Sequence, residues 1–79
     1  MAFATTEQEW AERAARHLKA ELKRANVTYD ELAERMKAHG FSETKASIAN
    51  KLARATMSAH FYLAALAATG RESVTLEDI

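Results

Sequence analysis

Apolar residues recur at three- and four-residue steps along most of the chain, which is the spacing that one face of an α-helix requires. The first such stretch puts Trp10 and Leu18 on one stripe. Thr6 can cap this helix, and Glu9 three residues later completes a capping box. We therefore predict a helix over residues 6–25, with Trp10 as a core anchor or, alternatively, as an exposed interface residue.

A second helix is predicted over residues 28–39, where Thr28 opens another capping box. Gly40 supplies the left-handed residue with which many helices end. A third helix is predicted over residues 42–55, with Ser42 as its cap and its apolar stripe turned inward. The second and third helices therefore meet across a short glycine turn.

The fourth predicted helix, residues 58–69, opens at Ser58 and is apolar almost all round, which is typical of a helix at the centre of a domain or at an interface. Residues 71–79 have the pattern of one further turn, so residues 1–79 are predicted to form one all-α domain. Large apolar side chains project from the fourth helix on more sides than one small core can cover, and we interpret those left over as a homodimer interface, here called the seam. A simply central helix is the alternative. The seam residues are Phe61, Tyr62, Leu63 and Leu66.

The composition removes several classes of chemistry. Because none of the 79 residues is a cysteine, disulfides and thiolate metal sites are excluded. The three histidines lie on different elements, and no Ser/His/Asp grouping or phosphate-binding glycine loop is present, so we expect no metal, no cofactor and no enzymatic activity. No stretch approaches the roughly 18–20 apolar residues of a membrane span, and no leader pattern is visible. A cytoplasmic protein without membrane contact is therefore expected.

Charge is balanced over the whole chain but not along it. Eleven Lys/Arg and eleven Asp/Glu give a net charge of zero and a pI of about 6.8. The first nine and the last nine residues each carry −2, which leaves +4 for residues 10–70. In and beside the predicted third helix there are three basic residues, Lys45, Lys51 and Arg54, and one acidic residue, Glu43. A local basic surface of this kind can bind phosphate, with a modest affinity that falls quickly with salt.

Two helices joined by a short glycine turn, with a polar and basic face on the second, are the parts of a helix-turn-helix. The chain from Leu18 onward resembles the phage-repressor (Cro/XRE-like) helix-turn-helix domains, in the segments LKAELKRANVTYDELAERM, SIANKLARA, FYLAALAATG and VTLEDI. The resemblance implies a four- to five-helix, lambda-repressor-like bundle. With Trp10 and GFSETKASIANKL included, nearly the whole chain also resembles a small bacterial family described only as a domain of unknown function.

The chain departs from the phage-repressor pattern in three places. The segment MKAHG prolongs the second helix, and Ala53, Arg54 and Ala55 stand where that family ends its recognition helix with glycine. At the start of the second helix, Tyr29 replaces a phosphate-binding glutamine but can still donate its hydroxyl hydrogen.

The resemblance implies a DNA contact surface on the predicted third helix and beside it. Asn50 is expected to pair with adenine, and Lys45 or Lys51 to donate to guanine or phosphate. Arg54 and Tyr29 are the expected contacts with the DNA backbone. For each residue the alternative is a solvated helix face. The implied set is Tyr29, Thr44, Lys45, Ser47, Asn50, Lys51 and Arg54.

The sequence therefore predicts a domain that reads double-stranded DNA as a homodimer and acts as a small bacterial transcriptional regulator. The alternative is a protein-protein interaction module, antitoxin-like or an assembly partner, that uses the same fold without binding DNA. The neutral charge balance favours the alternative, and the one-sided charge of the third helix opposes it.

Overall fold

The computed structural model describes residues 3–79, and within them every regular element is a helix. The all-α prediction is confirmed for this part of the chain; residues 1 and 2 of the predicted domain lie outside it. None of the helices in this range is long and apolar enough to cross a membrane. The α-helices are α1 (Glu7–Ala25), α2 (Tyr29–Met36), α3 (Lys45–Arg54) and α4 (Ala59–Ala68), and the 3₁₀ turns are η1 (Lys37–His39) and η2 (Leu76–Asp78).

The α-helices begin where short polar side chains can satisfy the free N–H groups of the first turn. Thr6, Thr28 and Ser58 each accept a hydrogen bond from the backbone N–H three residues later, so these three predicted caps are confirmed. The predicted cap Ser42 is wrong. Thr44 caps α3 instead, which therefore begins two residues later than expected.

The connection between α2 and α3 is longer than the predicted tight turn. α2 ends at Met36, and η1 continues the chain to Gly40, whose φ of 85° confirms the predicted left-handed stop. The predicted helix over residues 28–39 thus corresponds to α2 and η1 together. Eight residues, 37–44, separate the two α-helices, more than the three or four of a usual helix-turn-helix connection.

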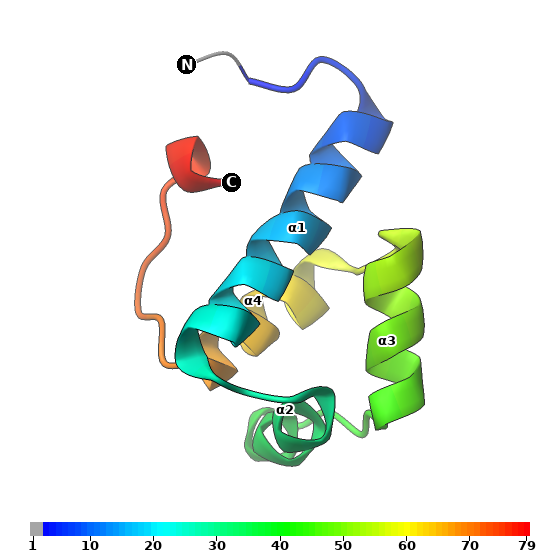
Figure 1. The fold of residues 1–79 in the computed structure, drawn as a ribbon, viewed down its shortest axis with the longest axis vertical. Coiled ribbons are helices and arrows are strands. Elements are labelled where there is room, and N and C mark those ends of the chain that lie inside the picture. Colours follow the sequence, from blue (N-terminus) through cyan, green and yellow to red (C-terminus); the bar gives the residue numbers. More distant parts are fainter. Residues whose placement is uncertain (1–2) are drawn as a thin grey trace.

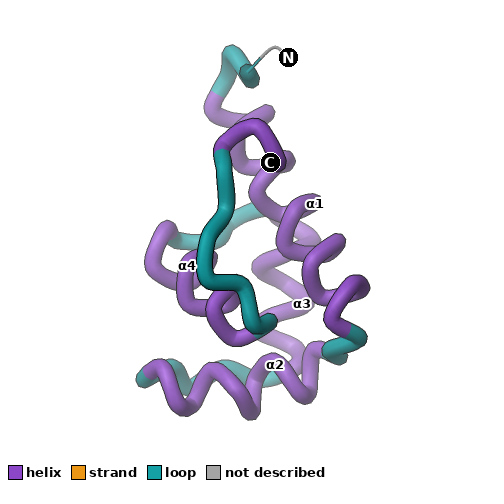
Figure 2. The backbone as a smooth tube through the Cα atoms, turned by 90° about the vertical axis from the view of Figure 1, so that its left-hand side faces the viewer, coloured by secondary structure: helices purple, strands orange, loops and turns teal. Residues whose placement is uncertain are grey.

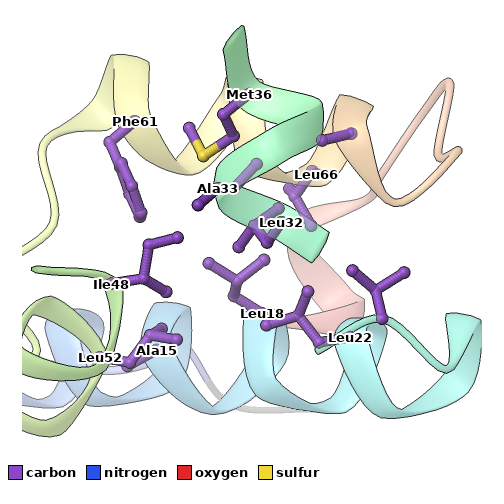
Figure 3. Packing of buried hydrophobic residues seen from close by; sticks show 13 residues of the cluster. Ala15, Leu18, Leu22, Leu32, Ala33, Met36, Ile48, Leu52, Phe61 and Leu66 are labelled. Carbon is purple, nitrogen blue, oxygen red and sulfur yellow. The ribbon is translucent and has the colours of Figure 1, made fainter. Parts of the chain in front are cut away.

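The core is one cluster to which all four α-helices contribute (Figure 3). Leu18 of α1 lies beside Leu32 of α2, and Met36 of α2, Ile48 of α3 and Phe61 of α4 belong to the same cluster. Each of these side chains is almost completely buried. Burying one such side chain stabilises the fold by roughly 1.5–3 kcal/mol, which explains how a chain without disulfides holds together.

The helices leave two separate surfaces open. In Figure 1, α3 stands at the right and the chain after α4 passes up the left side, with α1 and α4 between them. α2 lies across the bottom of the bundle, as Figure 2 shows, and runs across α3 rather than alongside it. The exposed side of α3 and the C-terminal segment therefore face opposite directions.

Trp10 is not the core anchor that its place in the apolar stripe predicts. The first turns of α1 extend beyond the other helices (Figure 1), and Trp10 is not among the residues in or packed against the core cluster. Its ring is 37% exposed and stacks on Phe3, with the ring centroids 6.0 Å apart. The alternative interpretation, a partly exposed tryptophan, is the one that the structure matches.

Residues 71–79, here called the strap, end in η2 as predicted and are tied to α1 by Glu21. The Glu21 carboxylate is almost fully buried and accepts hydrogen bonds from Arg71 of the strap and Arg24 of α1. The hydrogen bond from Arg71 lowers the pKa of Glu21 to about 2, against the opposing effect of burial and with further help from Arg24. Glu21 is therefore charged at neutral pH and holds the strap.

Candidate nucleic-acid interface

The candidate interface is the exposed side of α3. Only Ile48 and Leu52 of this helix are fully buried, and both belong to the core. The opposite side of α3 is open, at the right of Figure 1. It carries Ala46, Asn50 and Ala53. What this side of α3 can bind depends on which polar side chains near these residues are free.

Thr44 and Ser47 are engaged with each other at the start of α3. The Thr44 hydroxyl accepts from the Ser47 N–H at 3.0 Å, and the Ser47 hydroxyl accepts from the Thr44 N–H at 2.9 Å. This reciprocal capping box fixes the first turn of α3. Ser47 Oγ also lies 2.7 Å from a carboxylate oxygen of Glu43, to which it can donate its hydrogen. The two hydroxyls thus both take part in holding the start of α3.

Lys51 is part of an internal ion pair. Its Nζ lies 2.6 Å from Oε2 of Glu43 and 4.6 Å from the centre of the Phe61 ring. The Glu43 side chain is only 10% exposed, and that of Lys51 34%. Burial pushes the pKa of Glu43 upward, but hydrogen bonds from Lys51 and Ser47 and the charge of Lys51 outweigh it and leave this pKa below its ordinary value. Lys51 therefore joins the connection before α3 to α4.

Three of the residues expected to contact DNA are exposed and free of such contacts. In the part of the chain that the structure describes, the side chains of Lys45, Asn50 and Arg54 form no ion pair or hydrogen bond. Tyr29, at the first turn of α2, is half-buried against the core. The structure thus divides the expected set into free groups, a half-buried tyrosine and groups that hold α3 in place.

Two basic residues that the sequence reasoning did not select lie beside α3. Arg16 and Lys19 of α1 line a shallow hollow of about 300 Å³ together with Glu12 of the same helix, Ala53 of α3 and Ala55, the C-cap of α3. Within residues 3–79 neither Arg16 nor Lys19 forms an ion pair. Their three-residue spacing on α1 was visible in the sequence, but that α3 ends beside them was not.

The proposed dimer seam is mostly inside the domain. Phe61 and Leu66 are 1% and 4% exposed and belong to the core, so they cannot also meet a second copy. The Tyr62 hydroxyl lies 2.8 Å from Nδ1 of His17 on α1, and burial, followed by the charge of Glu21, raises the pKa of Tyr62 to about 12. Leu63, at 61% exposure, is the one seam residue that fully faces outward. The alternative interpretation, a central fourth helix, describes α4 better.

The sequence was compared with protein families, curated proteins and solved structures. Residues 10–74 match one family, which is described as a domain of unknown function (DUF6471). No curated protein matches. No solved structure matches either.

Proposed function

The chain belongs to the DUF6471 family, and we propose that it is a helix-turn-helix domain that binds double-stranded DNA and serves as a small transcriptional regulator. α3 is the reading helix and lies in the major groove. α2 packs across it and supports it. A B-DNA major groove is about 12 Å wide and admits one α-helix, so a helix buried along one edge and open along the other fits the task.

The observation that carries this proposal is the free set Lys45, Asn50 and Arg54 on or beside the open side of α3. An Asn side chain can pair with adenine through two hydrogen bonds, and Lys can donate to guanine or to a phosphate. Arg54, in the last turn, suits a phosphate contact. Tyr29 remains a backbone contact in this proposal, through its hydroxyl at the start of α2.

Thr44, Ser47 and Lys51 take another role in the proposal. Their polar atoms are occupied by the capping box and by Glu43. We therefore assign them to positioning α3 rather than to contacting DNA. This assignment narrows the expected surface to the residues that have no other partner.

The charge of the surface sets the expected affinity. Lys45 and Arg54, together with Arg16 and Lys19 of α1, provide up to four phosphate contacts. Four contacts correspond to a slope of about −3.6 in log Kobs against log salt concentration. Because the net charge of the chain is zero, we expect binding that is measurable at low salt and weak at physiological salt.

The test is a fluorescence-anisotropy titration of labelled double-stranded DNA pools at about 50 and 200 mM salt. We expect Arg54→Ala to flatten the salt slope by about one and Asn50→Ala to reduce sequence preference at constant slope. Arg24→Gln is the matched control. It removes one positive charge from the strap side of α1 while Arg71 still holds Glu21. No binding at the lower salt, or equal slopes for Arg54→Ala and Arg24→Gln, contradicts the proposal.

A protein-protein interaction module is the second candidate function, and one observation favours it. Leu63 of α4 and Leu76 of the strap are both more than 60% exposed, on elements that do not belong to the proposed DNA surface. If the titration detects no DNA binding, the protein-protein interaction module becomes the favoured function.

A further inference from the structure

The outer face of α4 carries no charge. None of the ten residues from Ala59 to Ala68 is Asp, Glu, Lys or Arg, although Leu63 and Ala67 are exposed. Surface helices ordinarily place charged side chains on their solvent side. An uncharged outer face on a small domain is typical of a surface that another molecule covers.

The strap turns this face into a groove. Val74 lies opposite Leu63, Leu66 and Ala67 across a hollow of about 150 Å³, and Leu63 and Val74 are themselves exposed. A cavity of about this size holds a benzene molecule. The hollow therefore has room for one aliphatic side chain of a partner.

The wall of the groove is fixed in place. The Arg71 N–H donates to the Leu66 carbonyl at 3.3 Å, while the Arg71 guanidinium is bound to Glu21. At the end of α4, Arg35 of α2 donates to the Ala68 carbonyl at 3.0 Å. The groove thus exists before any partner binds, which reduces the ordering cost of binding.

The charges around the groove are one-sided. The positive charge of Arg71 is used by the buried Glu21. Glu72 also lines the groove and forms no ion pair in residues 3–79. We propose that this groove binds an amphipathic helical segment of another protein, with an aliphatic side chain in the hollow and a Lys or Arg residue against Glu72.

A second copy of the chain fits the groove less well. A symmetric dimer would bring the Glu72 carboxylates of both copies to the same interface, where like charges repel. A stable interface of standard size also buries about 800 Å² on each partner. The two exposed large apolar side chains of the groove, Leu63 and Val74, provide much less than that. A short charged segment from another protein needs less area and gains from the Glu72 carboxylate.

The probe is a fluorescein-labelled helical peptide with leucines at i, i+4 and i+7 and lysines beside them. Its counterpart has the same leucines and glutamates in place of the lysines. We expect the lysine peptide to bind at micromolar concentration in about 150 mM salt and the glutamate peptide to bind at least fivefold more weakly. Leu63→Ser should weaken the lysine peptide about tenfold, and Glu72→Lys should reverse the preference between the peptides.

Phe3→Ser is the matched control, because Phe3 is a similarly exposed apolar residue that does not line the groove. Equal binding of the two peptides, or equal affinities for Leu63→Ser and Phe3→Ser, would overturn the proposal. A concentration-dependent dimer that Leu63→Ser abolishes would also overturn it in favour of a second copy. DNA titration of Leu63→Ser separates this result from the DNA proposal, since its salt slope should equal that of the unchanged protein.

Discussion

Replacing Lys51 with methionine separates the two roles that this residue can have. Methionine keeps an unbranched chain beside the Phe61 ring but removes the ammonium group that lies 2.6 Å from Glu43. If Lys51 positions α3, the substitution lowers the stability of the domain and leaves the salt dependence of DNA binding unchanged. If Lys51 contacts a phosphate, it lowers the salt slope and leaves stability unchanged.

The expected loss of stability follows from the surroundings of the pair. A hydrogen bond to a charged group contributes about 1.5–3 kcal/mol. The Lys51 side chain is one-third exposed and therefore screened, and Glu43 keeps the hydrogen bond from Ser47. We therefore expect Lys51→Met to lower the free energy of unfolding by about 1–2 kcal/mol. For a domain of this size that corresponds to a fall in Tm of roughly 5–15 °C.

The assay combines thermal unfolding, followed by helical circular dichroism, with the DNA salt titration. Lys45→Met is the matched control because Lys45 is exposed and has no ion-pair partner in the described chain. It should leave Tm nearly unchanged and flatten the salt slope by about one. The Tm difference between the unchanged protein and Lys51→Met should shrink below pH 4.5, since Glu43 is stabilising only while charged. A Lys51→Met variant with unchanged Tm and a flatter slope would refute the positioning role.

Three further substitutions test the fold. The pKa of Glu21 is about 2 in the folded protein and 4.5 as its ordinary value, so this carboxylate stabilises the fold above pH 4.5 and loses its effect as the pH falls toward 2. Because its arginine partners are about half exposed and screened by solvent, we expect the free energy of unfolding to fall by about 1–2 kcal/mol over this pH range. This acid-dependent loss should be absent in Glu21→Gln. Trp10→Ala should cost about 1 kcal/mol or less in denaturant unfolding, since the side chain is partly exposed, lies outside the core cluster and stacks on Phe3; a loss of about 3 kcal/mol or more would place Trp10 in the core. Ala55→Gly should raise stability by about 0.5–1 kcal/mol, because Ala55 has a φ of 53°; a lower Tm would contradict this.

The helices could be predicted because their starts are local events. At Thr6, Thr28 and Ser58 the side-chain oxygen accepts a hydrogen bond from the backbone N–H three residues later, so each helix start depends on neighbouring residues. The third start could not be decided in this way, because Ser42 and Thr44 are both good caps. Thr44 has the reciprocal partner Ser47, and the later start leaves Glu43 outside the helix, within reach of Lys51. The Glu43 contact joins residues eight positions apart, which helical periodicity does not reveal.

The site was predicted less well than the fold because side chains at the edges of a helix depend on its neighbours. Asn50 lies opposite the buried edge of α3, so its exposure followed from the sequence pattern. Lys51 lies at the edge beside α4, and only the position of Phe61 shows that it is engaged. The exposure of Trp10 likewise depends on how far α1 extends beyond the other helices, which no local pattern contains.

Two of the departures from the phage-repressor pattern lie at the ends of α3, and the structure shows what holds the chain at each. Where glycine is absent, Ala55 itself takes the left-handed conformation and its N–H bonds to the Leu52 carbonyl, so α3 still ends at Arg54. Where the connection from α2 is eight residues long, Glu43 ties its last part to Lys51, and Lys51 in turn lies on the Phe61 ring of α4. A short turn needs no such tie, because its length alone fixes the second helix. The same ion pair that removes Lys51 from the expected contact set therefore lets a longer connection hold α3 firmly enough to present Lys45, Asn50 and Arg54.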